Sequence, residues 1–181
     1  MGKSHDLATI ATDGLPTLEV DTIKNTSGTT ALTIDSNGFL KSNKESVFRA
    51  YMGSPAQTIP NNTNTVIQYN VESFDPNSWY DTSTYKFTPT LAGYYSVTVS
   101  LRYNTGADFD ICDLYLYKNT TIAASASDAH HRYDTLNLND IIYLNGSSDY
   151  LICNTLQVSG SSLSLRGYTS ETFFCAHRLA T

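Results

Sequence analysis

The stretch YDTSTYKFTPTLAGYYSVTVSLRYN, Tyr80 to Asn104, decides the fold of this chain. It contains a turn signal, Pro89 to Gly93, followed by a segment in which apolar and polar side chains alternate strictly. Alternation with a period of two predicts a β-strand that buries one of its faces. The buried face is expected to be unusually aromatic, and its residues are Tyr95, Val97, Val99, Leu101 and Tyr103.

The same organisation extends over the whole region from Val47 to Thr181. Short apolar segments such as VFRAYM, DICDLYLYKN and TFFCAHRL are separated by turn sequences such as NNTN, DPNS and SGSS. No stretch in this region shows sustained helical periodicity. Many short strands at this spacing predict an antiparallel β-sandwich or barrel.

Residues 1–46 have a different character. The stretch LEVDTIKNTSGTTALTIDSNGFLKSN contains short alternating pieces, with turn signals at Asn25 to Gly28 and Asp35 to Gly38. Its few apolar residues cannot be buried within one chain, so the segment either stays flexible or wraps against copies of itself. We expect an attachment arm over residues 1–16, a β-rich intertwined stem over 17–46 and a head over 47–181.

Composition and charge exclude several classes of function. The chain has 181 residues, a net charge of −6 and no cluster among its 11 lysines and arginines, so nucleic-acid binding is not expected. No apolar run reaches the roughly 18 residues of a membrane span, and the N-terminus has no signal-peptide pattern. Cys112, Cys153 and Cys175 lack metal-type spacing, which predicts buried reduced thiols and synthesis in a reducing cytoplasm.

Several motifs together point to a known fold family. The chain carries VFRAY at the start of the head, the Tyr80 to Tyr95 segment with its Gly-x-Tyr end, then LYLYKN, YLNGSSDYL and TFFCAHRLA. In sequence and order, these motifs resemble the C1q/TNF-like jelly rolls over nearly all of residues 47–181. The resemblance implies an all-β, trimeric jelly-roll sandwich as the head.

Three positions depart from the family's pattern. Tyr85 stands where glycine is usual, and Val97 replaces a phenylalanine. Ser147 and Ser148 separate Gly146 from the aspartate that normally follows it. The departures concern local turn geometry and the packing around the trimer axis, rather than the fold.

A second resemblance concerns the stem. The stretch VDTIKNTSGTTALTIDSNGFL is similar to a linker of bacteriophage tail-fibre and other virion proteins, cyanophages among them. It implies a homotrimeric virion protein, a short tail fibre or fibre tip that adheres to a host-surface glycan or protein. The arm would bind other virion proteins. The alternatives are a capsid decoration trimer and a secreted C1q-like binding module.

The family resemblance also implies which residues meet across the trimer axis. In such trimers three jelly rolls pack side by side, and aromatic residues line the contact. The candidates here are Tyr94, Tyr95, Tyr103, Phe173 and Phe174. The alternative for each of them is an ordinary place in the core of one chain.

No motif predicts an enzyme, a cofactor or a metal ion. The pair His130-His131 lacks a third ligand, and Asp108 and Asp110 belong to a turn-like segment in which acidic residues are common. Neither a nucleophile elbow, a phosphate loop nor a calcium loop occurs.

The segment TTIAASASDAHHRYDT, Thr120 to Thr135, is the candidate for host contact. It is either the longest connection of the head or partly a continuation of the preceding strand, and long connections are usually functional or disordered. The candidate receptor-binding residues mix charge, hydrogen-bonding groups and an aromatic ring, and they are Asp128, His130, His131, Arg132 and Tyr133.

Overall fold

The structure is a computed structural model that describes residues 21–42, 45–104, 110–128 and 135–180. The chain divides into two compact units, residues 1–45 and 46–181, which are described separately below. The described residues form strands, turns and loops, without a helix. None of them, therefore, belongs to a helix that could cross a membrane.

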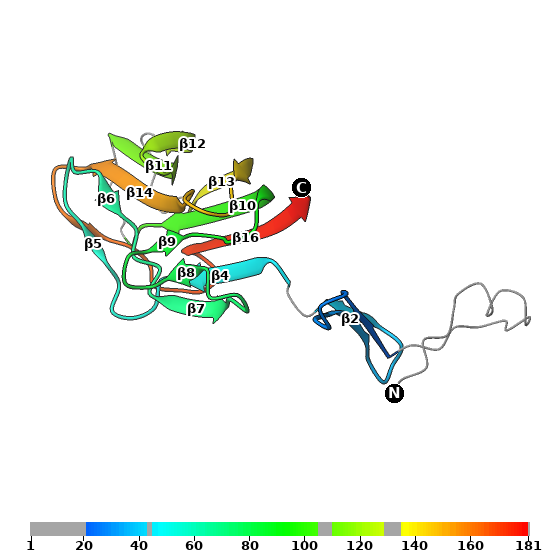
Figure 1. Cartoon of the computed structure of the whole chain (residues 1–181). Coiled ribbons are helices and arrows are strands. Elements are labelled where there is room, and N and C mark those ends of the chain that lie inside the picture. The colour runs from blue at the N-terminus through cyan, green and yellow to red at the C-terminus, as the bar shows by residue number, and fades with distance from the viewer. Residues whose placement is uncertain (1–20, 43–44, 105–109, 129–134, 181) are drawn as a thin grey trace, which may run out of the picture. The chain divides into compact units, whose positions relative to one another are not determined.

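The second unit, the head, is a two-layered antiparallel sandwich (Figure 1). One sheet has the order β13-β10-β16-β4-β7, and the other has the order β12-β11-β14-β9-β8 with β6 also paired to β14. A small third sheet joins β15 to β5. The strands are β4 (Val47–Tyr51), β5 (Thr58–Ile59), β6 (Thr65–Val66), β7 (Val71–Phe74), β8 (Tyr80–Asp81), β9 (Lys86–Phe87), β10 (Gly93–Arg102), β11 (Ile111–Lys118), β12 (Thr121–Asp128), β13 (Thr135–Leu144), β14 (Leu151–Val158), β15 (Leu163–Ser164) and β16 (Phe173–Ala180).

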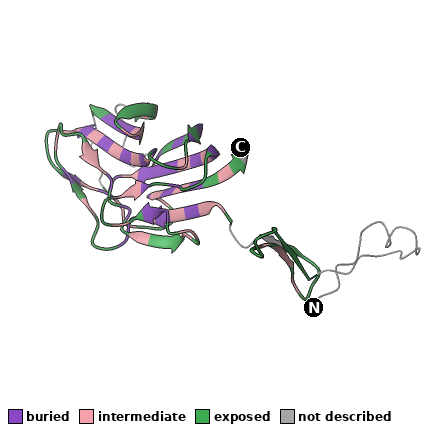
Figure 2. Cartoon of the chain, viewed as in Figure 1, coloured by how far each residue is buried: buried purple, intermediate pink, exposed green. Residues whose placement is uncertain are grey.

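The long strand β10 has the buried face that its sequence predicts. Tyr95, Val97, Val99 and Leu101 are completely buried, and Tyr103, just beyond the strand, is 2% exposed. The buried residues gather between the two layers of the head (Figure 2). A departure from the family pattern, Val97, therefore lies in the core of the chain itself.

An aromatic cluster connects the two sheets. The ring of Phe48 in β4 stacks on Phe87 in β9 at 4.3 Å between centroids and meets Phe174 in β16 edge to face at 4.8 Å. Tyr95 meets Phe87 at 5.7 Å, also edge to face. Such pairs add to the free energy gained by burying the rings, roughly 0.5–1.5 kcal/mol each. The aromatic content of β10 therefore serves the core of one head.

Three of the residues expected at the trimer contact are thus placed elsewhere. Tyr95, Tyr103 and Phe174 are buried inside one chain, and the prediction that they meet their copies was wrong. Their polar atoms are also used internally, because the Tyr95 hydroxyl donates to the Leu91 carbonyl at 2.8 Å. The Tyr103 hydroxyl lies 2.8 Å from Thr155 Oγ1. The alternative, a place in the core, holds for these three.

The turn at Tyr85 explains one departure from the family. Tyr85 has a φ of 58°, in the left-handed region that favours glycine. Asp81 holds the turn, since its Oδ1 accepts hydrogen bonds from the Ser83 amide and hydroxyl at 2.8 and 2.6 Å. Its Oδ2 accepts one from the Thr84 hydroxyl at 2.8 Å. The backbone therefore keeps the conformation of a glycine although the residue is tyrosine.

The two extra serines after Gly146 form a capped turn between β13 and β14. Asn145 Oδ1 accepts the backbone N–H groups of Ser147, Ser148 and Asp149 at 2.9, 3.0 and 3.0 Å. Asp149 in turn accepts a hydrogen bond from Asn119 Nδ2 and pairs with Lys118, each at 2.9 Å. The turn is thereby tied to the β11–β12 hairpin.

The first unit contains a three-stranded antiparallel sheet of β1 (Thr22–Lys24), β2 (Thr30–Ile34) and β3 (Leu40–Ser42). Its two turns are built alike. Asn25 Oδ1 accepts the amides of Ser27 and Thr29, and Asp35 Oδ1 accepts those of Asn37 and Phe39. Each turn ends in a glycine with a positive φ, which is 83° at Gly28 and 82° at Gly38.

The apolar side chains of this small sheet are exposed. Ile23, Phe39 and Leu40 have 47%, 69% and 65% of their surface accessible, and exposed residues run along its strands in Figure 2. A three-stranded sheet that buries so little has almost no hydrophobic stabilisation of its own.

Candidate functional site

The β13-β10-β16-β4-β7 sheet has one face against the core and one outer face that points away from it. Polar pairs occupy its centre, where Thr98 Oγ1 donates to Asn139 Oδ1 at 2.8 Å between β10 and β13. Cys175 lies in register with Thr98 on one side and with Arg49 on the other. In this central region Thr98, Cys175 and Arg49 are half-buried within one chain, and Asn139 is exposed.

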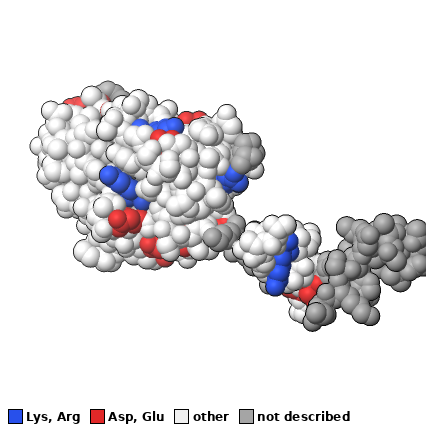
Figure 3. Space-filling model, viewed as in Figure 1, with Lys and Arg blue, Asp and Glu red and all other residues white. Residues whose placement is uncertain are grey.

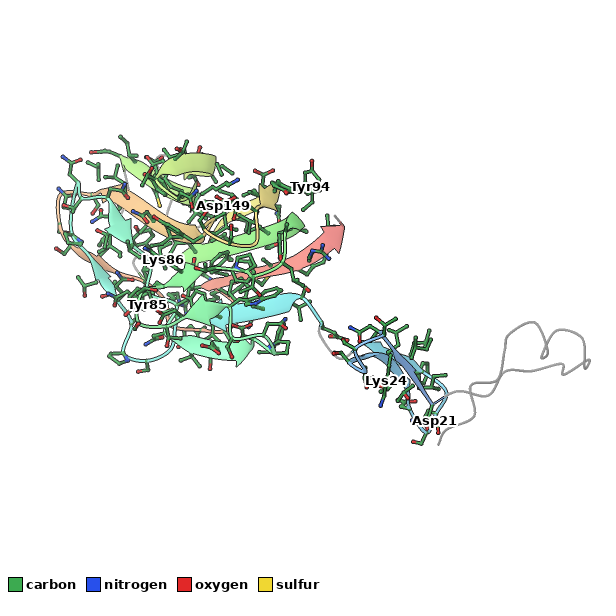
Figure 4. The ribbon with its side chains drawn as sticks, viewed as in Figure 1. Asp21, Lys24, Tyr85, Lys86, Tyr94 and Asp149 are labelled. Atoms are coloured by element: carbon green, nitrogen blue, oxygen red, sulfur yellow. The ribbon has the colours of Figure 1, made fainter. Side chains whose placement is uncertain are left out.

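An exposed aromatic patch lies at one end of the same face. Tyr94 and Tyr143 are partners in the β10–β13 register, and their rings meet edge to face at 5.4 Å. Ile141 precedes Tyr143 by two residues in β13 and is opposite Ser96 in β10. Tyr94, Tyr143 and Ile141, here called the Tyr94 patch, are 49%, 46% and 59% exposed (Tyr94 is labelled in Figure 4). Grouped large apolar side chains on a surface mark interaction sites.

Arg49 and Phe173 form a second contact on this face. The Arg49 guanidinium lies 4.7 Å from the centroid of the Phe173 ring, and Arg49 Nη1 donates to Ser73 Oγ at 2.9 Å. Arg49 Nη2 also donates to the Thr169 carbonyl. Phe173 is half-buried. Of the five residues expected at the trimer contact, Tyr94 and Phe173 are those that lie on an outer face.

Sequence reasoning missed two members of the Tyr94 patch, Ile141 and Tyr143. A signal for them exists in the sequence, because Ile141, Ile142, Tyr143 and Leu144 are four consecutive large apolar residues. A strand that is apolar on both faces is typical of a strand covered on both sides. Ile142 and Leu144 face the core, and Ile141 and Tyr143 face outward.

The segment expected to touch a host receptor is only partly a loop. Thr121–Asp128 forms β12, an edge strand paired antiparallel with β11, so the long connection expected over these residues is wrong. The alternative, in which part of the segment continues the preceding strand, is wrong as well, because β11 ends at Lys118 and a turn at Asn119 and Thr120 precedes β12. The segment resembles a loop in sequence because its strand is made mainly of alanine and serine. Asp128 ends β12 opposite Cys112. His130, His131, Arg132 and Tyr133 lie outside the described residues.

The described residues show neither a cluster of metal ligands nor a reactive thiol. They contain no group of three His, Cys, Asp or Glu side chains that could hold a metal ion. On the face shown in Figure 3, charged side chains are scattered over a largely uncharged surface. Burial raises the pKa of the Cys112 thiol to about 12 and also raises the pKa of Cys153 and Cys175, so all three stay protonated near neutrality.

The ion pairs around Glu171 stabilise one loop of the head. Glu171 accepts a hydrogen bond from Arg102 at 2.8 Å and pairs with Arg166 at 3.0 Å, just before β16. The Arg166 guanidinium also lies 5.0 Å from the ring of Tyr168. These contacts fix the loop that leads into β16.

Comparison with known proteins shows the fold of the head. The sequence matches no protein-family model and no curated protein sequence. The structure is similar to murine APRIL, with a TM-score of 0.58 at 10% identity, covering 75% of this chain and 100% of that chain. It is also similar to Eiger TNF from S. frugiperda, with a TM-score of 0.55 at 11% identity, covering 74% and 92%. The globular domain of a zebrafish complement 1qA protein gives 0.52 at 12%, covering 76% and 100%.

The predicted fold class is confirmed by these similarities together with the strand order. The chain is all-β over its described residues and has a TNF/C1q-like jelly roll as its head.

Proposed function

We propose that this chain is a homotrimeric structural protein of a bacteriophage virion, a short tail fibre or the tip of a longer one, that attaches to the host surface. The Tyr94 patch carries the proposal, since it is an exposed cluster of two aromatic rings and an isoleucine on a sheet whose other face is the core. Aromatic residues with polar tips suit a contact between chains that is apolar but not dry.

The outer sheet face supports self-association as the use of this patch. Phe173 and Arg49 lie on the same face, and arginine and aromatic residues are enriched where proteins meet. The resemblance to the C1q/TNF-like jelly rolls gives three as the number of copies, because that family packs its heads about a three-fold axis.

The stem supports the same assembly by a separate route. Its three strands expose Ile23, Phe39 and Leu40, and a single copy of such a sheet is marginal in water. Three copies can cover these side chains and pair the free strand edges, which would otherwise invite aggregation. The two like turns keep the strands short and regular.

The placement in a virion follows from the likeness of the stem to tail-fibre linkers. It implies synthesis in the host cytoplasm, attachment through residues 1–16 and a head that binds a host glycan or protein. The proposed role is non-enzymatic.

Two measurements test the proposal. Light scattering should give a particle of three times 19.9 kDa that persists on dilution, whereas a single-chain mass contradicts it. Gold labelling of purified virions should place the protein on the tail. Label on the capsid lattice would instead indicate a decoration trimer. The position of the gene separates the other alternative, because a gene far from virion genes would indicate a secreted C1q-like binding module.

A further inference from the structure

A shallow groove lies on the outer face of the other sheet, on β6, β11 and β14. It has a volume of about 260 Å³, and its lining includes Asn64, Val66, Tyr117, Thr120, Ile152 and Asn154. These residues are distant in the sequence and belong to three separate strand regions. The groove is separate from the Tyr94 patch, which is on the β13-β10-β16-β4-β7 sheet.

Strand register places the lining residues side by side. Tyr117 in β11 is opposite Ile152 in β14, and Asn154 in β14 is opposite Val66 in β6. Ile152 and Asn154 are half-buried, while Cys153 between them is buried in the core. The alternation of β14 therefore turns an aliphatic side chain and an amide out toward the same side as the Tyr117 ring.

Two polar side chains of the groove, Tyr117 and Asn154, have hydrogen-bonding capacity to spare, whereas the Asn119 amide is already paired within the chain. Asn64 Nδ2 donates to the Tyr117 hydroxyl at 3.1 Å, which leaves the hydroxyl proton of Tyr117 to be donated elsewhere. The side-chain oxygen of Asn154 is buried without a hydrogen-bond partner. Because the terminal torsion of asparagine is broad, this oxygen can turn toward a ligand hydroxyl. Unpaired buried acceptors are uncommon, and such a group is paired by ordered water or by a bound ligand.

The composition of the groove selects the class of ligand. Its lining offers an aromatic ring, amides, hydroxyls and aliphatic side chains, and it includes no charged side chain. A phosphate or an acidic peptide would find no counter-charge among these residues. A sugar ring presents hydroxyls at its rim and an apolar C–H face, which suit amides and an aromatic ring respectively.

We propose that this groove binds one neutral sugar ring of a surface glycan. The inference rests on the proposed adhesive function and gives it a place and a ligand class. Its volume lies below the roughly 300–1,000 Å³ of pockets for drug-sized ligands, in keeping with a single ring. One shallow site binds weakly, and several sites on one assembly reach useful strength through avidity.

The test uses the full chain on an array of immobilised oligosaccharides, with neutral glycans of glucose, galactose, mannose and N-acetylglucosamine beside sialylated and sulfated ones. Wild type should be retained by at least one neutral glycan. Tyr117→Ala and Asn154→Ser should each lower retention at least ten-fold. Tyr168→Ala, which removes a 56% exposed tyrosine outside the groove, is the matched control and should bind like wild type.

Circular dichroism checks that each variant is folded, and Tyr117→Phe is the milder substitution if Tyr117→Ala is not. Retention by acidic glycans alone, or equal retention of wild type and the groove variants, would overturn the inference. Binding to host cells separates this result from the proposed function. If wild type and the groove variants all bind cells equally, adhesion stands and the groove fails, whereas wild type that binds neither cells nor glycans overturns both.

Discussion

Gly146 lies against the backbone of Ala92, so closely that a β-carbon at position 146 would be 2.3 Å from the Ala92 nitrogen. The contact joins the β13–β14 turn to the turn that precedes β10. Gly146 also has a φ of 69°, which side chains rarely adopt. Two independent physical reasons therefore require glycine at this position.

Gly146→Ala is expected to lower the free energy of unfolding by roughly 2–5 kcal/mol, the sum of a left-handed backbone penalty and an overpacking penalty. Gly160→Ala is the matched control, because Gly160 has a φ of 82° and open space around it. It should cost only the backbone penalty of about 1–2 kcal/mol. Urea denaturation at one fixed protein concentration measures both, and equal losses would contradict the close approach to Ala92.

Substitutions of Tyr85 test the departure from the family pattern at this turn, where glycine is usual. A non-glycine residue at a φ of 58° lowers the free energy of unfolding by about 1–2 kcal/mol. Glycine lowers it by about 0.5–1 kcal/mol for another reason, because it gives the unfolded chain more conformational entropy. Tyr85→Gly should therefore leave the free energy of unfolding within about 1 kcal/mol of wild type, and Tyr85→Asn should be similarly tolerated. Tyr85→Val should be clearly the least stable, since β-branched residues avoid this region. Equal urea midpoints for all three variants would show that the turn relaxes.

The sequence predicts the strands of the head better than it predicts which side chains reach a surface. The alternation of β10 specifies its buried face because every second residue must share one side of a strand. The same rule shows why the predicted trimer contact was partly wrong. Tyr94 and Tyr95 are neighbours, as are Phe173 and Phe174, so one member of each pair had to face the core.

Other features depend on contacts that one segment does not contain. Edge strand β12 has small side chains and therefore gives almost no apolar pattern, although pairing with β11 makes it a strand. The groove unites Asn64, Tyr117 and Asn154 only through the order of β6, β14 and β11. Sheet order is a property of the whole fold, and local alternation carries no information about it.

Asp81 makes part of the stability depend on acidity. Hydrogen bonds from Ser83, and then from Thr84, lower the pKa of Asp81 from 3.8 to about 2. A carboxyl whose pKa is lower in the folded state stabilises the fold fully above the unfolded value, and this contribution is lost as the pH falls through the folded value. The urea midpoint of wild type should therefore fall between about pH 4 and pH 2.

Asp81→Asn is the matched variant for this effect, since it keeps an oxygen for Ser83 and removes the titration. Its urea midpoint should fall less steeply over the same pH range than that of wild type. Asp149, whose pKa is lowered chiefly by the hydrogen bond from Asn119, leaves a residual slope in both proteins. Superimposable acid profiles would show that Asp81 does not hold the turn in solution.

The Tyr94 patch gives the sharpest test of self-association. Ile141→Asp places a charge within the exposed Tyr94 patch, and a charge that becomes buried between chains without a partner is costly. If this patch is the contact, the concentration at which half of the trimer dissociates should rise more than about ten-fold. Because the dissociation constant of a trimer scales with the square of that concentration, this is a loss of about 2.7 kcal/mol per mole of trimer. Ile122→Asp is the matched control, because Ile122 is 48% exposed on β12 in the other sheet. Sedimentation velocity over a dilution series compares the three proteins, with circular dichroism to verify that each is folded. Dissociation of the Ile122 variant but not of the Ile141 variant would place the contact between chains on the opposite sheet.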